Sequence, residues 1–112
     1  MPYSEDADTN RPLSPYAASK KAAETLAHTY HYLHGIDVSI VRYFNSYGPR
    51  IDEQGYGSVI AQFIRQALTD QPLTVHGHGN QSRCFTYVTD TIEGTIRAAT
   101  MKSALGRAFN VG

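Results

Sequence analysis

The chain has 112 residues, ten of them basic and ten acidic, so its formal net charge is zero. A nucleic-acid partner is not expected, because binding phosphates along a strand requires a clustered excess of Lys and Arg. No apolar run is long enough to span a bilayer, and no basic-then-apolar signal opens the chain. The single cysteine, Cys84, excludes an internal disulfide and fits a cytoplasmic protein.

The first predicted elements are a polar surface loop over residues 1–13 and a long helix. Ser14 can cap this helix, Pro15 suits its first position, and Gly35 can end it. Its many alanines are strong helix formers, and such small residues let another helix approach closely. We therefore expect this helix to make a helix–helix or subunit contact.

A strand and a second helix follow. Residues 38–44 are β-branched, aromatic and mostly apolar, which predicts a buried strand of a parallel sheet. Residues 45–57 contain Gly and Pro and predict a loop. The second helix is indicated by apolar residues at helical spacing: Val59, Ile60, Phe63, Ile64, Ala67 and Leu68.

The last part of the chain predicts short strands at residues 73–76 and 84–88, separated by a Gly-rich turn. Thr89 can cap a third helix, and residues 108–111 read as a final strand. This order predicts an α/β fold, although no Gly-rich strand-to-helix phosphate turn occurs in the chain. The expected inner face of the third helix consists of Ile92, Ile96 and Ala99.

Tyr16 and Lys20 lie four residues apart on the first helix, so their side chains share one face. A free tyrosine, with a pKa of about 10, is a poor base at neutral pH, and a nearby ammonium favours its phenolate. The spacing thus suits a proton-transfer pair. The alternative is an exposed Tyr and Lys on a solvated face, since both residues are common on helices.

Four ordered sequence blocks surround this pair. They read Ser-Pro-Tyr-Ala-Ala-Ser-Lys at 14–20, Arg-Tyr-Phe-Asn-Ser-Tyr-Gly-Pro-Arg at 42–50, Pro-Leu-Thr-Val-His-Gly-His-Gly at 72–79 and Arg-Cys-Phe-Thr-Tyr-Val-Thr-Asp at 83–90. In this order and spacing they resemble the extended short-chain dehydrogenase/reductase family of nucleotide-sugar epimerases, dehydratases and decarboxylases. The resemblance runs over nearly the whole chain, from Pro2 to Gly112.

The resemblance implies the C-terminal part of a Rossmann-like doubly wound sheet plus the start of a small substrate-binding domain. Residues 1–50 would belong to the Rossmann-like part, with the Tyr16 helix and the strand after it. Residues 51–112 would form the nucleotide-sugar-binding subdomain, whose last strand could return to the sheet. The family's glycine-rich dinucleotide turn lies upstream in its pattern, so we expect a fragment that lacks the main NAD site.

The resemblance also assigns roles. Tyr16 would be the acid/base, and Lys20 would favour its phenolate and hydrogen-bond the nicotinamide ribose. Tyr43 would join these two at the cofactor, and Asn45 would contact the sugar nucleotide near its phosphates, unless it is a turn asparagine bonded to its own backbone. Arg83 would bind the pyrophosphate, with a surface ion pair as the alternative.

Four further positions complete the expected substrate site. Arg50 would face the substrate or stabilise its loop. The remaining three, which would wall the nucleotide base or pack in the core, are Val59, Thr74 and His76.

The implied reaction begins with NAD-dependent oxidation of the sugar C4 hydroxyl. Epimerisation, decarboxylation or dehydration then follows, and the sequence does not choose among them. A UDP-linked sugar is the favoured substrate, because residues 55–60 and 72–79 look closest to UDP-glucuronate decarboxylases and UDP-glucose 4-epimerases. A homodimer or higher oligomer through the Tyr16 helix is expected.

Two other interpretations fit parts of the sequence. The chain could be a catalytically inactive module that oligomerises or binds a nucleotide sugar. A metal site could use the helix residues His28, His31 and His34, but His28 and His34 diverge by about 120° around the helix and no carboxylate or thiol block joins them. No metal is therefore expected.

Overall fold

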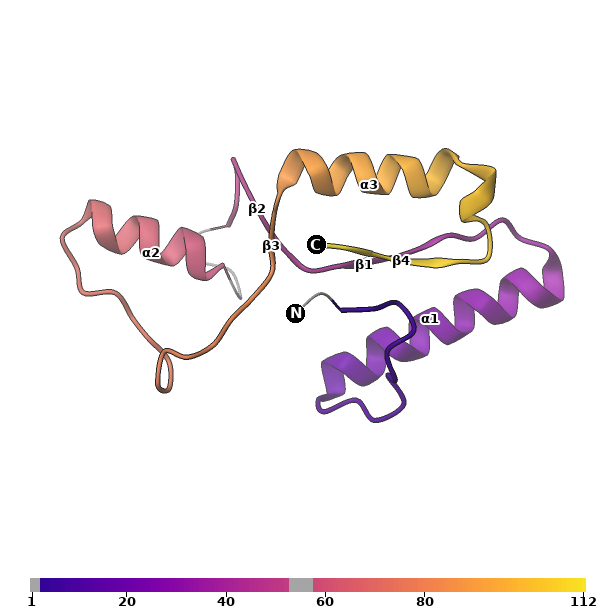
Figure 1. The fold of residues 1–112 in the computed structure, drawn as a ribbon, viewed down its shortest axis with the longest axis horizontal. Coiled ribbons are helices and arrows are strands. Elements are labelled where there is room, and N and C mark those ends of the chain that lie inside the picture. The colour runs from indigo at the N-terminus through magenta and orange to yellow at the C-terminus, as the bar shows by residue number, and fades with distance from the viewer. Residues whose placement is uncertain (1–2, 53–57) are drawn as a thin grey trace. The chain divides into compact units, whose positions relative to one another are not determined.

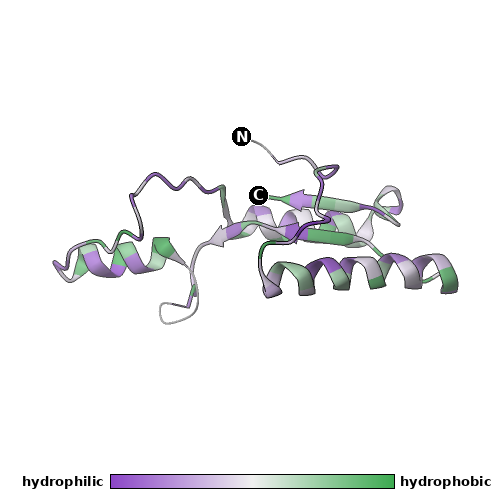
Figure 2. Cartoon of the chain, turned by 90° about the horizontal axis from the view of Figure 1, so that it is seen from below, coloured by the Kyte–Doolittle hydropathy of each residue, from purple (hydrophilic) through white to green (hydrophobic). Residues whose placement is uncertain are grey.

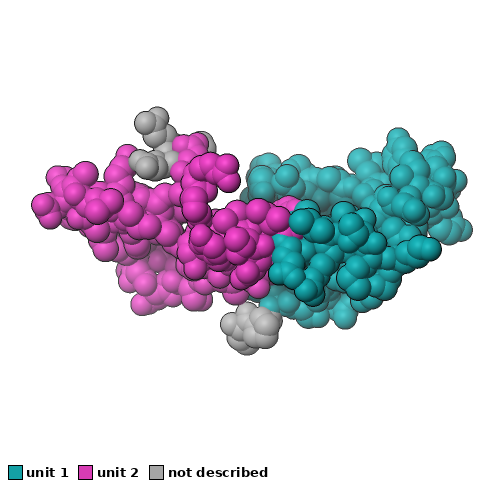
Figure 3. Space-filling view, turned by 90° about the horizontal axis from the view of Figure 1, so that it is seen from above, with its two compact units in different colours: residues 1–42, 93–111 teal, residues 43–92, 112 magenta. Residues whose placement is uncertain are grey.

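The computed structural model describes residues 3–52 and 58–112, so the parts of the predicted loops at 1–2 and 53–57, including Gly55 to Gly57, lie outside it. Two compact units are present: residues 1–42 with 93–111, and residues 43–92 with Gly112 (Figure 3). The elements in chain order are α1 (Pro15–His34), β1 (Ile40–Tyr43), β2 (Asn45–Tyr47), α2 (Val59–Leu68), β3 (Phe85–Tyr87), α3 (Val88–Thr100), a 3-10 turn (Lys102–Ala104) and β4 (Ala108–Val111).

In the first unit, α1 begins and ends where the sequence predicts. The Ser14 hydroxyl accepts a hydrogen bond from the Ala17 N–H at 3.1 Å. Gly35 has a left-handed φ of 64°, and its N–H donates to the carbonyl of His31 at 3.0 Å. Figure 2 shows hydrophobic and hydrophilic bands alternating along this helix.

The first unit is layered, with β1 and β4 side by side between two helices (Figure 1). α1 covers one face of the pair, and α3 from Glu93 onwards covers the other. A Cβ added to Gly94 of α3 would lie 3.2 Å from the Cγ atoms of Val111. Glycine therefore lets α3 come close to β4.

The predicted inner face of α3 is wrong. Ile92, Ile96 and Ala99 are all exposed. The small residues Gly94 and Ala98 face inwards instead, since a short side chain allows the closest helix–strand approach. The predicted cap at Thr89 is also wrong, because α3 begins directly after β3 and leaves no separate capping position.

The second unit contains a two-stranded parallel sheet in which β2 pairs with β3. Asn45 lies opposite Phe85, and Tyr47 lies opposite Tyr87, with their rings in edge contact at a centroid distance of 5.5 Å. The sequence predicted a loop from residue 45, which is wrong for these first residues. The strand predicted at residues 38–44 is confirmed in shorter form as β1, which pairs with β4, and after Phe44 the chain changes partner, so that β2 pairs with β3.

The prediction of a strand at residues 73–76 is also wrong. The segment has no strand partner among the residues that the structure describes. A strand is defined by its backbone pairing, and here side chains satisfy part of the backbone instead. The strand predicted at 84–88 is confirmed in shorter form as β3, and the strand at 108–111 is confirmed as β4.

The apolar interior is small. Within the described ranges, the buried apolar residues are Ala61, Ala98 and Ala104. Many large apolar side chains remain exposed, including several on α1. No described helix combines the length and the apolar character needed to cross a membrane.

Candidate functional site

Tyr16 and Lys20 are brought together near the start of α1. The Lys20 Nζ lies 5.3 Å from the centroid of the Tyr16 ring, a cation–π distance. The Tyr16 side chain is 72% exposed, and no hydrogen bond to its hydroxyl is seen within residues 3–52 and 58–112. A hydroxyl and an ammonium on one open helix face can donate and accept hydrogen bonds to sugar hydroxyls.

The helix that carries this pair is fixed to β1 by an ion pair. Arg42 Nε donates to Glu24 Oε2 at 2.9 Å, and Arg42 Nη2 donates to Glu24 Oε1 at 2.5 Å. This bidentate arrangement is the geometry in which Arg binds carboxylates most strongly. The Glu24 side chain is only 13% exposed, and Lys21 adds a contact at 3.8 Å. The pair therefore sets the rotation of α1 against the strand.

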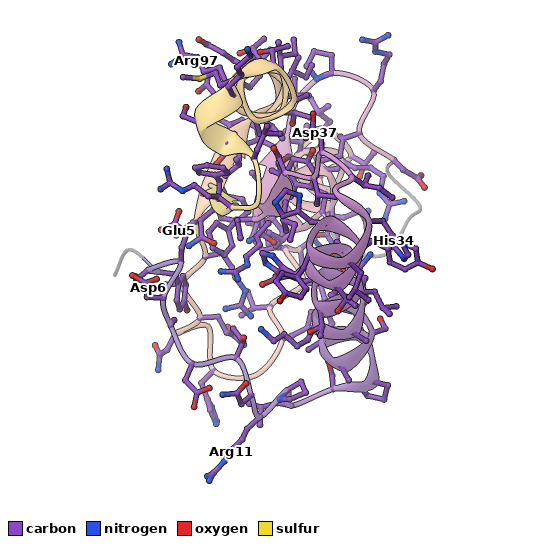
Figure 4. All side chains as sticks on the ribbon, turned by 90° about the vertical axis from the view of Figure 1, so that its right-hand side faces the viewer. Glu5, Asp6, Arg11, His34, Asp37 and Arg97 are labelled. Carbon is purple, nitrogen blue, oxygen red and sulfur yellow. The ribbon has the colours of Figure 1, made fainter. Side chains whose placement is uncertain are left out.

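The same arginine holds the N-terminal segment. Arg42 Nη1 donates to the Glu5 carbonyl at 2.9 Å. The Glu5 carboxylate, labelled in Figure 4, accepts from the Asn110 N–H at 2.9 Å, and Asn110 Nδ2 donates to the Tyr3 carbonyl at 2.8 Å. The segment that leads into the Tyr16 helix is thus attached to both strands of the first unit.

These contacts shift the acid–base properties of the network. The hydrogen bonds from Arg42 lower the pKa of Glu24 below its usual value, and the same contact raises the pKa of Arg42. The hydrogen bond from the Asn110 N–H lowers the pKa of the exposed Glu5. The contact between Glu24 and Arg42 is therefore strongest while both groups are charged.

Asn45 begins β2 of the second unit, and Arg83 lies just before the neighbouring strand β3. Asn45 Nδ2 donates to the Cys84 carbonyl at 3.1 Å, across the sheet rather than to its own turn. Arg83 is exposed, and its Nη1 donates to the Ser82 carbonyl at 2.8 Å. Because Asn45 is opposite Phe85, Arg83 precedes that register position by two residues. An amide and a guanidinium are thus presented near one sheet end.

Thr74 and His76 are fixed by glutamine side chains. Gln66 of α2 makes two hydrogen bonds to Thr74, and Gln81 Nε2 donates to the His76 carbonyl at 2.6 Å. Val59 is the first residue of α2 and is partly exposed. The second unit therefore brings these expected base-contacting positions onto α2 and the segment that follows it.

Two other expected site residues lie at strand ends. Tyr43 is the last residue of β1, and about half of its side chain is exposed. Arg50 follows β2 with a left-handed φ of 68°, a strained conformation for a non-glycine residue.

Two of the three helix histidines contact groups of the same chain. His31 Nδ1 donates to the Ile36 carbonyl at 2.6 Å, and the His34 ring lies 5.3 Å from the Tyr30 ring. In the described part of the chain, no group of three potential ligands could hold a metal ion.

The sequence analysis missed four residues that build the site. Glu24 and Arg42 orient α1, and Gln66 and Gln81 hold the segment with Thr74 and His76. One signal was available. A permanently charged arginine inside a predicted apolar strand requires a buried partner, and Arg42 was such a residue. The glutamines carried no such signal.

Comparison with known proteins identifies a family. The model of the NAD dependent epimerase/dehydratase family matches residues 1–112. A UDP-glucuronate 4-epimerase of Thermodesulfobacterium geofontis is 44% identical over 99% of this chain and 33% of its own length. A UDP-N-acetyl-alpha-D-glucosaminuronate decarboxylase of Bacillus cytotoxicus is 47% identical over 99% of this chain and 36% of its own length.

Solved structures agree. The UDP-glucuronic acid 4-epimerase of Bacillus cereus, in complex with UDP-glucuronic acid and NAD, superposes with a TM-score of 0.81. It is 42% identical, and the match covers 91% of this chain and 32% of that one. The chain thus spans about a third of the length of the curated relatives it matches. It has the α/β fold of part of these Rossmann-like enzymes.

Proposed function

The chain belongs to the NAD dependent epimerase/dehydratase family, as its four sequence blocks predicted, and we propose that it carries two parts of a nucleotide-sugar enzyme. One part is the proton-transfer pair of the first unit. The other is a binding site for the nucleotide of the sugar in the second unit. The observation that supports this most strongly is the close approach of Lys20 to Tyr16 on an open helix face.

The proton step is assigned to Tyr16. In the full reaction its phenolate would take the proton of the sugar C4 hydroxyl, and the Lys20 ammonium would stabilise the phenolate. NAD, when bound, supplies the hydride acceptor for the same carbon. Lys20 would also hydrogen-bond the ribose, with Tyr43 as a further cofactor contact. The exposed hydroxyl and ammonium fit such a diol-rich partner.

The nucleotide site is assigned to residues 51–112 together with the end of the first predicted domain, 1–50. Arg83 would bind the pyrophosphate as a planar, permanently charged donor. Asn45 would bind nearby through the second N–H of its Nδ2, because phosphate oxygens accept hydrogen bonds and the other N–H donates to the Cys84 carbonyl. Arg50 would face the substrate from its strained loop. The base would lie against Val59, Thr74 and His76. A UDP-linked sugar is proposed because both sequence relatives compared above are named for UDP-sugars.

A titration with UDP tests this site. Arg83→Met should weaken UDP binding about tenfold or more, since a charge-assisted contact to phosphate contributes roughly 1.5–3 kcal/mol. The matched control is Arg65→Met, which removes the same charge from an exposed position on α2. Equal losses in both variants would show a general charge effect and contradict the assignment.

The step that follows oxidation at C4 is epimerisation, decarboxylation or dehydration, and the proposal does not choose among the three. For the 112 residues by themselves we propose binding without turnover, because the chain contains no Gly-rich dinucleotide turn. Incubation with NAD and a UDP-sugar should yield no NADH absorbance and no new sugar product. Turnover by the isolated chain would contradict this part of the proposal. A cytoplasmic location is proposed from the lone thiol of Cys84.

We also propose that α1 forms a contact between two copies of the chain. Leu26 and Leu33 are 58% and 64% exposed on the side of the helix away from β1, and the alanine at position 22 lies near them. Such an apolar stripe is typical of a helix that packs on another helix. Leu26→Glu should convert a dimer to a monomer in light scattering. Thr25→Glu, which lies about 80° or more around the helix from both leucines, should cause a smaller shift.

A further inference from the structure

Two glutamine side chains hold the segment that carries Thr74 and His76. Gln66 lies in the last turn of α2 and uses both ends of its carboxamide on one residue. Its Nε2 donates to Thr74 Oγ1 at 2.7 Å, and its Oε1 accepts from the Thr74 N–H at 3.1 Å. Gln81 Nε2 donates to the His76 carbonyl at 2.6 Å.

The main chain of Gln66 fixes the start of the same segment. Its carbonyl accepts from the Gln71 N–H at 2.8 Å. Asp70, with a left-handed φ of 52°, reverses the chain direction between helix and segment. Residue 66 thus fixes residue 71 through its backbone and Thr74 through its side chain. The path of the chain between them is determined by one residue of the helix.

The far end of the segment is shaped around Gln81. Gly77 and Gly79 both have left-handed φ values, of 69° and 73°, and form the turn that brings Gln81 back to His76. A Cβ added to Gly77 would lie 3.2 Å from Gln81 Nε2. The glycine therefore leaves room for the carboxamide beneath the turn.

A carboxamide offers the same groups as a peptide bond, an N–H donor and a C=O acceptor. A neighbouring strand would present these groups to residues 73–76, but no strand pairs with them among the described residues. The carboxamides of Gln66 and Gln81 provide at Thr74 and His76 the hydrogen-bonding groups that a neighbouring strand would provide. They do so from fixed points on α2 and beyond the turn, so the segment keeps one register relative to the helix.

We infer that Gln66 and Gln81 are positioning residues of the nucleotide site, which fix the backbone of residues 73–76 so that Thr74 and His76 meet the nucleotide. This inference rests on the proposed function. In this proposal neither glutamine contacts the nucleotide. Both act through the position of residues 73–76.

The test compares Gln66→Met with Gln62→Met. Both changes remove a carboxamide from α2, but no side-chain hydrogen bond of Gln62 is seen in the described part of the chain. Gln66→Met should raise the hydrogen-exchange rate of the Thr74 amide about tenfold and weaken UDP binding by a similar factor, because the hydrogen bonds lost contribute roughly 1.4 kcal/mol in total. Gln62→Met should change neither quantity.

A conservative variant separates positioning from packing. Glu at position 66 can accept hydrogen bonds from both the Thr74 N–H and its hydroxyl, so Gln66→Glu should keep slow exchange and most of the UDP affinity. If Gln66→Met unfolds the chain, Gln81→Met provides the same comparison outside a helix. It should increase the mobility of residues 75–77 in ¹⁵N relaxation and weaken UDP binding.

The outcomes distinguish this inference from the proposed function. Unchanged exchange at Thr74, or unchanged UDP affinity despite faster exchange, would overturn the positioning role and leave the nucleotide site intact. A wild-type chain that does not bind UDP would overturn the proposed site and the positioning role with it, even if exchange at Thr74 responds as expected.

Discussion

The two units hold their functional segments by different chemistry. In the first unit, α1 is attached to β1 by the charged pair Arg42–Glu24, which also attaches the N-terminal segment through Glu5. In the second unit, the segment after α2 is attached by the neutral carboxamides of Gln66 and Gln81. In both units these polar contacts stand in place of extensive apolar packing, because few apolar side chains are buried among the described residues.

This difference has a direct consequence for how each unit responds to its surroundings. A charged contact depends on pH and is partly screened by salt, whereas an amide hydrogen bond depends on neither. The helix with Tyr16 should therefore loosen under acid conditions that leave the segment with Thr74 in place. Substitutions in either unit, and a change of pH, can test this difference between the charged and the neutral attachment.

The largest effect is expected from Gly48→Ala, in the second unit. A Cβ at this position would lie 2.5 Å from Val88 Cγ1, and Gly48 has a φ of 153° that side-chain-bearing residues rarely adopt. Steric overlap and backbone strain together should destabilise the chain by about 3 kcal/mol. Gly35→Ala is the control, because Gly35 has a left-handed φ but open space around it, so about 1 kcal/mol is expected. Urea unfolding measures both, and equal losses would contradict the close approach.

Arg42→Met should give the next largest loss, in the first unit. It leaves the Glu24 carboxylate largely covered and without its bidentate partner, at a cost of about 2 kcal/mol. Adding Glu24→Gln to Arg42→Met should recover part of that loss, since no unpaired charge then remains. A double-mutant cycle in urea gives the coupling energy. Additive losses would show that the two side chains act independently.

Acidification should weaken the Glu24–Arg42 ion pair and leave the glutamine hydrogen bonds unchanged. The folded-state pKa of Glu24 lies below its ordinary value of 4.5, so its contribution to stability is present above that value and lost as the pH falls through the folded pKa. Between about pH 6 and about pH 3, the wild type should therefore lose more unfolding free energy than Glu24→Gln. Hydrogen-exchange protection factors at Thr74, corrected for intrinsic rates, should stay constant while α1 still holds. Parallel losses in wild type and variant would contradict the role of Glu24.

The smallest effect is expected from Arg97→Met, which calibrates the scale for an ion pair in solvent. Arg97 and Glu93 form an i,i+4 pair on α3, but their side chains are 69% and 61% exposed. The change in unfolding free energy should be about 0.3 kcal/mol. A loss as large as that of Arg42→Met would mean that coverage of Glu24 does not explain the strength of the Arg42 contact.

Local sequence patterns predicted most of the helices and strands but few of the long-range contacts that hold them together. Ser14, Pro15 and Gly35 marked both ends of α1 because capping depends on residues next to the helix. The split of residues 38–44 and 45–47 between two sheets could not be predicted, since it depends on partners more than 35 residues away in sequence.

The site shows the same limit. The four blocks identified the family and named Tyr16 and Lys20, which the helix indeed places together. The sequence predicted Ile92, Ile96 and Ala99 as the inner face of α3, whereas the close packing of α3 on β4 requires a small residue such as Gly94. The role of Gln66 could not be predicted from the sequence. Its partner, Thr74, lies beyond the chain reversal at Asp70, and the contact depends on the geometry of that reversal.

The most direct test of the proposed nucleotide site is a map of UDP on the ¹⁵N-labelled chain by chemical-shift perturbation. We predict saturable shifts at Asn45, Thr74, His76 and Arg83. Tyr16 and Lys20 should not shift, because UDP lacks the second sugar, beyond the pyrophosphate, on which they would act. Absence of saturable shifts, or shifts confined to α1, would contradict the proposed nucleotide site.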